Sequence, residues 1–600
     1  MHPLKNGSQV TERPDNKPSS GSPGYFTESG DNNIPSFPGA DWFNDTIDEF
    51  SSALSSCGVE FDPTSTQNLA KAFDSKLSKD NFKDFSKVFY SSTLGLDLAK
   101  DCRFELQAAW QACADNGWLF FIDEQYLVDC YLHTYPDGYE RWIGLQVPSN
   151  SRCQFGINAA LKLIPNSLPT YYVINFYLSD NFKLFYPKVI GDKSEHTGTT
   201  GEWGHCYNVV SCSNGLVLEP KAYDAWGDGI YVGLEYNTVT PKQIENVVIE
   251  DATLINSSRN SLSFTSGVNV HVTIKEASGA DRIAPKALVD VEPEFGYQVP
   301  GFKPIFENCS VHLHSTTKDN YEALSGLLIY VNDLDMDKFE LSFTVSGDFS
   351  NVSTPIQIDL PRSSPIDGYI ESSSVSIANP KSFPFYHRSR VSNGIFTLID
   401  RGTVSNPNGS MLPGANKLIK FEGFGSGVDS GNLSLNLNVL DDANIAYLYE
   451  ASNADLENVK VNFSLSRNKS VVSDWSLFSN SKLGSSCKFD VGFSNNVPYV
   501  TYFSASILSR GLTNFHVKPT SVDGITLTLS TKDSMYRRIK SLKLGSSAYP
   551  LTIAKGDSNM IFNGASVSTI STNDPLAELE IYSEGSNRYV NSISGNFSTT

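Results

Sequence analysis

The chain has 600 residues, a formal net charge of −20 and a pI near 4.9. This length exceeds what one compact core usually supports, so several domains or one long repetitive body are expected. The acidic balance argues against nucleic acid as a partner, because phosphate binding requires clustered lysine and arginine. Residues 1–24 lack the apolar core of a signal peptide, and no run of 18 uncharged apolar residues occurs, so neither export nor membrane insertion is predicted.

Neither a metal site nor a cofactor is predicted. The nine cysteines include no CxxC pair, so they are expected to be reduced thiols that serve as small apolar residues. His312 and His314 share one face of a strand in "VHLH", but no third ligand stands near them in the sequence.

The N-terminal part reads as an arm followed by a helical unit. Residues 1–40 are rich in proline, glycine, serine and asparagine and are expected to be extended. From 41 to 90 apolar residues recur at helical spacing, with Asp45 and Thr64 as the expected N-caps. A small helical unit is therefore predicted ahead of the main body.

The stretch "DCRFELQAAWQACADNG", residues 101–117, predicts an amphipathic helix. Asp101 is placed to cap its start, and Gly117 stands just past its end. Its expected apolar stripe consists of Phe104, Ala108, Ala112 and Cys113. Strand-like residues "WLFFIDEQYLV" follow at once, so the helix is expected to cover the open end of a stack of strands.

From about 205 to 480, short strand-like runs recur, each after a turn, at a spacing of roughly 24 to 38 residues. This spacing is typical of the coils of a parallel β-helix with loops of unequal length. An asparagine precedes several strands, where amides can stack from coil to coil and bond the turn backbone. These structural asparagines are Asn214, Asn246, Asn269, Asn308 and Asn458. Beyond 480 the repeat fades, and a separate β domain is predicted.

Two neighbouring coils repeat one motif: "GEWGHCYNVV" at 201–210 and "AWGDGIYVGL" at 225–234. Aligning the coils predicts an inward column of Tyr207, Ile230, Leu262 and Val289. The alignment also predicts a second column of His205, Asp228, Asn260 and Ala287, with Trp203 below Trp226 and Arg259 below Lys286. An outward row of Asn208, Tyr231, Ser263 and Asp290 is expected, with Glu292 on the same face.

This convergence predicts a carbohydrate site. Aromatic faces stack on sugar rings, while carboxylates, amides and arginine bind hydroxyls. Glycosidic cleavage needs one protonated and one ionised carboxyl group, and clustering of acids raises one pKa. The expected catalytic residues are Asp228, Asp290 and Glu292. The expected substrate-binding residues are Glu202, Trp203, His205, Trp226, Tyr231, Arg259, Asn260 and Lys286.

Structural roles are open for the same residues. The two tryptophans could form an aromatic ladder that stiffens the coils. Asp228 could cap a turn, and His205 could be a turn partner. Asp290 and Glu292 could belong to a solvated strand face.

The N-terminal stretch "GYFTESGDNNIPSFPGADWFND", at 24–45, resembles the virion-attachment segment of bacteriophage tail fibres and tailspikes. The stretches "WGDGIYVG", "SSRNSLSF" and "PKALVDVEPE", with the helix before them, resemble the pectate-lyase-like right-handed parallel β-helix proteins of phages. The resemblance implies a homotrimeric tailspike of the virion tail, attached to tail or baseplate proteins through its N-terminus, that depolymerises a bacterial capsule or O-antigen. The family's "GI-D-IEPN" segment reads "LVDVEPE" here, keeping Asp290, Glu292 and Pro293.

The resulting organisation is an all-β chain with a small helical N-terminal region. We expect virion attachment by residues 1–95, a linker and capping helix over 96–118, a catalytic β-helix over 119–480, and a C-terminal β domain over 481–600 that trimerises the protein or binds sugar. Endoglycosidic hydrolysis is the leading activity. Two alternatives are a tail fibre that binds polysaccharide without cutting it, and a polysaccharide lyase in which Arg259 or Lys286 neutralises a uronic acid.

Overall fold

The computed structural model describes residues 40–56, 68, 87–136, 138–235, 242–293, 305–316 and 323–331, and, from 339 to 600, the strands given below with short flanking segments. The chain divides into two units, Met1–Lys87 and Val88–Thr600. In the first unit the described element is helix α1, Ala40–Ser56. The helix begins before Asp45, so the expectation that Asp45 caps its start is wrong. Thr64 lies outside the described residues.

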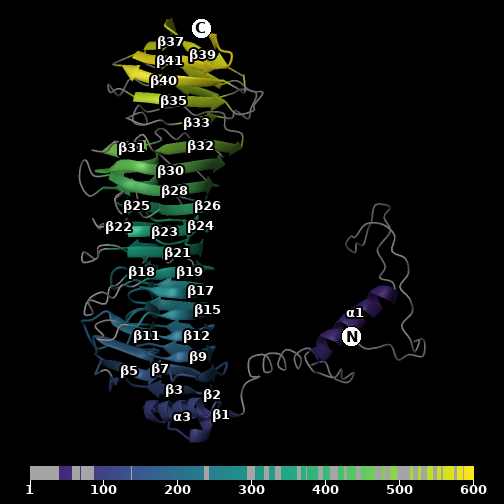
Figure 1. The fold of residues 1–600 in the computed structure, drawn as a ribbon, viewed down its shortest axis with the longest axis vertical. Helices are drawn as coiled ribbons and strands as arrows, with labels where there is room; N and C mark the ends of the chain where they lie inside the picture. The colour runs from purple at the N-terminus through teal and green to yellow at the C-terminus, as the bar shows by residue number, and fades with distance from the viewer. Residues whose placement is uncertain are drawn as a thin grey trace. The chain divides into compact units, whose positions relative to one another are not determined.

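The second unit is built on two long, almost wholly parallel sheets, whose strands stack in chain order as in Figure 1. Sheet A has 19 strands: β1 Val88–Tyr90, β2 Leu119–Ile122, β3 Gln125–Val128, β6 Arg152–Phe155, β7 Ala160–Leu163, β9 Asp180–Phe185, β10 Lys188–Ile190, β12 Ser213–Leu218, β13 Lys221–Tyr223, β15 Glu245–Ser257, β17 Gly267–Gly279, β19 Phe306–Leu313, β21 Phe339–Asp348, β23 Ile366–Ser372, β24 Val375–Ala378, β26 Phe396–Ser405, β28 Asp429–Val439, β30 Asp455–Ser466 and β32 Lys488–Asn495.

Sheet B has 13 strands: β4 Tyr131–Thr134, β5 Glu140–Gln146, β8 Thr170–Asn175, β11 Trp203–Val210, β14 Ile230–Gly233, β16 Leu262–Phe264, β18 Ala287–Val291, β20 Ser325–Tyr330, β22 Thr354–Leu360, β25 Phe385–Ser389, β27 Lys417–Glu422, β29 Tyr447–Ser452 and β31 Ser476–Ser479. Only β4 and β5 of this sheet pair antiparallel. Apolar side chains from both sheets meet in one continuous core between them. The predicted parallel β-solenoid is confirmed.

Helix α3, Arg103–Asp115, lies at the start of the solenoid after the short 3₁₀ helix η1, Ser91–Leu94. Gly117 follows the helix with φ of +65°, as a residue beyond a helix end commonly does. The predicted apolar stripe is wrong except for Cys113, because Phe104, Ala108 and Ala112 are exposed. The buried residues are instead Leu106, Trp110, Cys113 and Ala114. The predicted cap is also displaced by one residue, since Cys102 rather than Asp101 occupies the N-cap position.

The asparagine ladder is confirmed near the N-terminal ends of successive strands of sheet A. The side-chain amide of Asn246 donates to Asn214, that of Asn269 to Asn246, and that of Asn308 to Asn269, at 3.3, 3.1 and 2.8 Å. Asn458 donates likewise to Asn432. All six have φ between 50° and 60°, in the left-handed region that asparagine tolerates better than most residues. Each of these amide bonds therefore links a coil to the preceding one.

After the solenoid the strands form two smaller sheets. A six-stranded sheet contains β33 Asn514–Val517, β35 Arg537–Leu544, β40 Glu578–Glu584, β41 Asn587–Ser594, β37 Asn559–Phe562 and β38 Ala565–Val567. A four-stranded sheet contains β34 Ile525–Thr528, β36 Leu551–Ala554, β39 Thr569–Thr572 and β42 Ser598–Thr599. Antiparallel pairs such as β35 with β40 interrupt the parallel pattern of the solenoid.

Candidate functional site

The aligned coils have the predicted register in sheet B. Tyr207 pairs with Ile230, Ile230 with Leu262, and Leu262 with Val289, and all four are buried in the core. Asn208 pairs with Tyr231, Tyr231 with Ser263, and Ser263 with Asp290, so the predicted outer row is also in register. The site residues therefore come from β11, β14, β16 and β18 and from the residues that flank these strands, on successive turns of the solenoid.

His205 and Asp228, which occupy the repeated ionisable position of the two coils, form a hydrogen-bonded ladder with Asn260 of the next coil. The backbone N–H of Asp228 donates to His205 Nδ1 at 3.0 Å, and the N–H of Asn260 donates to Asp228 Oδ1 at 3.0 Å. The N–H of Ala287 donates in turn to Asn260 Oδ1 at 2.9 Å. Each side chain thus satisfies a buried backbone donor of the following coil, which would be costly to leave unpaired.

Arg259 is the centre of a cluster of carboxylates beside this ladder. Its Nη1 donates to Asp228 Oδ2 at 2.9 Å, its Nη2 lies 3.5 Å from Glu292 Oε2, and its Nε lies 3.7 Å from Glu202 Oε2. Asp290 is linked to the cluster through Asn260 Nδ2, which donates to Asp290 Oδ2 at 2.8 Å. The coils bring all four predicted acids to one arginine.

Charge and burial perturb two groups of this cluster. Burial raises the pKa of Glu292, and the negative charges of Asp228 and Glu202 raise it further, while Arg259 and a hydrogen bond with Asp290 oppose the rise. Burial alone would lower the pKa of Arg259, but the surrounding carboxylates outweigh it and raise that pKa. Glu292 is therefore an acid suited to holding a proton, and Arg259 stays charged.

Solvent reaches only part of the cluster. Asp228 and Asp290 are 0% exposed, and Asn260 is equally buried. By contrast, the side chains of Glu292 and Glu202 are 27% and 41% exposed. The expected catalytic residues Asp228 and Asp290 are therefore closed to solvent, as are Asn208 and Ser263 of the outer row. Of the acids around Arg259, Glu292 and Glu202 are the ones that a ligand can touch.

Two predicted binding residues lie elsewhere. Trp226 packs against the core, and its ring stacks on His196 at 4.2 Å between centroids, so it does not extend the surface of Trp203. Lys286 takes part in none of the ion pairs found among the described residues around Arg259. Its left-handed φ of +64° directs the chain into β18 directly after a proline. Neither residue joins the site.

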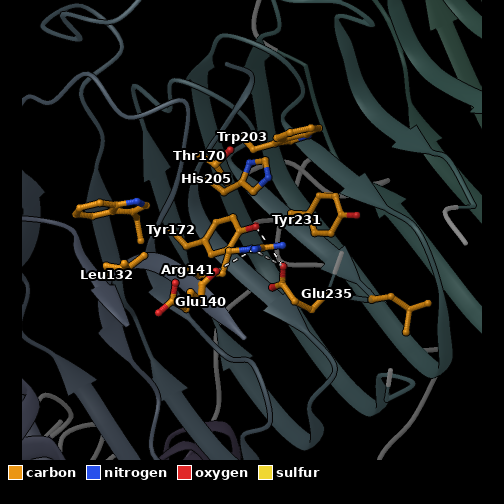
Figure 2. Close-up of a pocket in the computed structure, with 11 residues that line it drawn as sticks. Leu132, Glu140, Arg141, Thr170, Tyr172, Trp203, His205, Tyr231 and Glu235 are labelled. Carbon is orange, nitrogen blue, oxygen red and sulfur yellow. Dashed lines mark hydrogen bonds and ion pairs between the residues drawn. The ribbon is translucent and has the colours of Figure 1, made fainter. Parts of the chain in front are cut away.

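A cavity of about 380 Å³ lies beside the cluster, over β4, β5, β8, β11 and β14. Figure 2 shows Trp203, His205 and Tyr231, all predicted as binding residues, around it together with Arg141, Tyr172 and Glu235. The lining also includes Leu132, Glu140, Trp142, Thr170 and Leu234. Trp203 and Trp142 are 40% and 37% exposed, so two indoles remain open to solvent at this site.

The imidazole of His205 is held between two tyrosine rings of this cavity. Its centroid is 5.5 Å from that of Tyr172 and 5.2 Å from that of Tyr231, with interplanar angles of 8° and 11°. Burial lowers the pKa of His205 to about 4, so the ring is neutral near pH 7. Because Nδ1 accepts from a backbone N–H, the proton of the neutral ring is on Nε2. His205 can therefore donate a hydrogen bond.

A buried carboxylate fixes the far side of the cavity. Glu235 is 2% exposed and accepts from Tyr139 at 2.6 Å, Arg141 Nε at 3.1 Å and Asn208 at 2.9 Å. The guanidinium of Arg141 lies 3.9 Å from the ring centre of Tyr139. These contacts hold Arg141 in one orientation at the wall of the cavity.

Sequence reasoning missed Arg141, Trp142, Tyr172 and Glu235. The available signal was "PTYYVIN", residues 169–175, because Tyr172 pairs with His205 one turn earlier. Extending the coil alignment towards the N-terminus would have found it. Arg141 and Trp142 lie in β5 next to the antiparallel β4, where the coil repeat gives no guide.

Metal binding and membrane crossing gain no support from the described part of the chain. Its histidine, cysteine, aspartate and glutamate side chains form no group of three placed to hold a metal ion. Its helices are too short or too polar to cross a bilayer.

No protein-family model matches this chain. It is 29% identical over 233 residues to the uncharacterized protein YclG of Bacillus subtilis, covering 36% of this chain and 40% of that protein. It is 25% identical over 173 residues to the SPbeta prophage-derived uncharacterized protein YorA of Bacillus subtilis, covering 27% and 29%. It is 26% identical over 271 residues to the Mu-like prophage FluMu defective tail fiber protein of Haemophilus influenzae, covering 38% and 42%. The chain thus spans less than half the length of these curated relatives.

Among solved structures, PfbA, a surface adhesin of Streptococcus pneumoniae, aligns with 84% of this chain and 99% of its own. The identity is 11% and the TM-score is 0.27.

Proposed function

We propose that this protein is a phage tail component that binds a bacterial surface polysaccharide in the cavity over β5 to β14. The observation that carries the proposal is the combination of exposed Trp142 and Trp203 with the neutral His205 and the fixed Arg141 in one cavity. Indoles bind the apolar faces of sugar rings at low entropic cost, and fixed donors bind the hydroxyls. Similarity to a prophage tail fiber protein supports the tail assignment.

Binding is tested with purified capsular polysaccharides and O-antigens from a panel of bacterial strains. Trp203→Ala and Trp142→Ala should each weaken binding of the recognised polysaccharide by at least about tenfold, because buried aromatic contacts dominate binding energies. Trp42→Ala is the matched control, since Trp42 is 45% exposed in the N-terminal unit. Failure to bind any member of the panel, or equal binding by all three variants, would contradict the proposal.

Endoglycosidic hydrolysis is the second candidate, and the exposed pair Glu292 and Glu202 favours it. Both carboxylates contact neighbouring nitrogens of Arg259, so their oxygens lie within about 10 Å, which admits the roughly 6.5–9.5 Å spacing of inverting enzymes. Glu292, with its raised pKa, would protonate the leaving oxygen, and Glu202 would activate water. Asp228 and Asp290, being buried, would hold Arg259 and Glu292 in place. A lyase is not proposed, because Arg259 already pairs with three carboxylates.

Hydrolysis is tested by following reducing ends and polymer size after incubation with a bound polysaccharide. Glu292→Gln and Glu202→Gln should each lower turnover by about a hundredfold or more, the scale of losing a general acid or base. Glu245→Gln, on the exposed surface of β15, is the control. If the wild-type protein binds the polymer but the polymer stays intact, hydrolysis is excluded and the binding function remains.

The proposal also includes a homotrimer attached to the virion through residues 1–95, as the resemblance to tailspikes implies. Light scattering of the purified full chain tests the trimer. A monomer at micromolar concentration would contradict that part of the proposal.

A further inference from the structure

A second group of polar and aromatic residues lies on the outer face of sheet B, on the turns after the carboxylate cluster. We call it the distal cluster. It consists of Tyr330, Asp359, Phe383, Tyr386, Arg388, Lys417, Lys420, Glu422 and Glu450, from β20 to β29 and the segment before β25. Neither the sequence repeat nor the site described above accounts for it.

The distal cluster continues the outer face of sheet B from Glu292 onwards. Val291 pairs with Ile329, which places Glu292 beside Tyr330, and Tyr330 pairs with Asp359 and Asp359 with Arg388. Burial raises the pKa of Tyr330, and the charges of Asp359 and Glu292, on either side of it in the register, raise it further. At about 4.8 Å per turn, Arg388 is about 14 Å along the axis from Glu292.

The ionic groups of the distal cluster are held in fixed geometry. Arg388 donates from Nε and Nη2 to both oxygens of Asp359, each at 2.7 Å. The side chain of Asp359 is 9% exposed, and that of Arg388 is 28% exposed. Such a bidentate pair keeps its donors oriented before any ligand arrives.

A second ion pair lies next to aromatic rings. Lys420 Nζ is 2.7 Å from Glu422 Oε2, and Glu422 also accepts from the Tyr386 hydroxyl at 3.3 Å. Lys420 Nζ lies 5.5 Å from the ring centre of Phe383 and 5.7 Å from that of Tyr386. The rings, the cation and the carboxylate thus form one partly exposed surface.

The balance of charge indicates what could bind there. The three cations, Arg388, Lys417 and Lys420, are matched by three acids, Asp359, Glu422 and Glu450, through direct ion pairs. An anionic ligand would have to displace a carboxylate, and an apolar partner would have to desolvate the ion pairs. Hydroxyl groups can donate to the acids and accept from the cations without breaking either pair.

We infer that the distal cluster is a second binding subsite for an uncharged stretch of the polysaccharide that occupies the cavity, so that the ligand is a long chain lying along the solenoid axis. This inference depends on the proposed binding function. The inference adds that affinity rises with the length of the polysaccharide and that residues of the turns β20 to β29 provide the additional affinity.

The test compares a capsular polysaccharide that the wild-type protein binds with short fragments of it made by partial acid hydrolysis. The first variant is Asp359→Asn with Arg388→Gln, which replaces the ion pair by two amides of similar size. The second is Lys420→Gln with Glu422→Gln, whose side chains are 23% and 35% exposed, so folding is not at risk. The control is Asp400→Asn with Arg401→Gln, an exposed pair on β26 of sheet A.

Both distal variants should lose at least about tenfold in affinity for the polymer, the effect of one charge-assisted hydrogen bond. Their affinity for short fragments, and both affinities of the control, should match the wild type. Unchanged polymer binding by both distal variants would overturn the inference while the proposed function stands. Wild-type protein that binds no polysaccharide of the panel would overturn both.

Discussion

Replacing Asp228 by asparagine should destabilise the solenoid, and this prediction separates a structural aspartate from an exposed catalytic one. Asp228 is 0% exposed and accepts from Arg259 Nη1 at 2.9 Å, from Ser263 Oγ at 2.8 Å and from the N–H of Asn260 at 3.0 Å. The asparagine oxygen can keep the backbone bond. Its NH₂ group, however, would face two donors and leave them without an acceptor.

The expected loss is about 3 kcal/mol in the free energy of unfolding. Removing one partner of a buried ion pair costs about 3–5 kcal/mol, because the remaining charge stays buried. Arg259 would retain Glu292 at 3.5 Å and Glu202 at 3.7 Å, so its charge is not left alone and the lower end of that range applies. The unmet hydroxyl donor of Ser263 prevents the cost from becoming negligible.

The assay is urea-induced unfolding at pH 7 and one protein concentration, followed by tryptophan fluorescence. Glu292→Gln is the matched control, since it removes an acid from the same arginine at a partly exposed position. Its cost should stay below about 1 kcal/mol. If Asp228→Asn unfolds at the wild-type midpoint, or no earlier than Glu292→Gln, the assignment of Asp228 to the structural ladder is refuted.

Three further predictions concern the asparagine ladder, pH and catalysis. Asn269→Ala should cost about 2 kcal/mol and Asn269→Gly about 1 kcal/mol in urea unfolding, because glycine retains the left-handed φ of +53° and only the amide bonds are lost. Burial lowers the pKa of His387 to about 3. As pH falls below about 6.5, the unfolded chain therefore binds a proton at this residue before the folded chain does. The free energy of unfolding should then decline towards pH 4 by up to about 1.4 kcal/mol per pH unit. His387→Phe should remove that share of the decline, measured as urea midpoints at pH 7 and pH 5. If Glu292 is a general acid, turnover should fall as pH rises through its raised pKa, whereas a rise in turnover over that range would exclude the role.

The coil register was predictable because buried strands impose strict spacing. Tyr207, Ile230, Leu262 and Val289 must all point into one core, so aligning them fixes the position of every neighbour on sheet B. The same constraint placed Arg259 next to acids that are far away in sequence. The asparagine ladder followed from residue chemistry, since few other side chains tolerate a left-handed turn and also bond from coil to coil.

Exposure was not predictable from the same pattern. Strand alternation separates inner from outer side chains, but it does not say which outer row is covered. Segments between strands also contact one another across turns: Lys193 Nζ donates to Asn256 and pairs with Asp281, and the N–H of Arg282 donates to Ser258. The lengths of these segments vary from coil to coil, so the repeat carries no information about where they lie.

The two tryptophans show how equivalent positions in a repeat can diverge. Trp203 begins β11 and faces the cavity, whereas Trp226 precedes β14 and packs on His196 from the segment before β11. Their shared motif reflects the ladder that follows each of them rather than a common binding surface. Likewise, the antiparallel pair of β4 and β5 supplies Trp142 and Arg141 from outside the repeat.

The buried acids around Arg259 have a structural role, whereas the exposed acids can contact a ligand. The difference follows from their hydrogen-bond partners. Asp228 and Asp290 accept hydrogen bonds from Asn260 on adjacent turns, so they connect coils and hold charge away from water. That arrangement fixes Arg259, whose remaining nitrogens then face Glu202 and Glu292 at the surface. Because two surface acids share one arginine that the buried acid Asp228 already engages, the arginine cannot fully neutralise them. Burial raises the pKa of Glu292, and the charges of Asp228 and Glu202 raise it further against the opposing charge of Arg259.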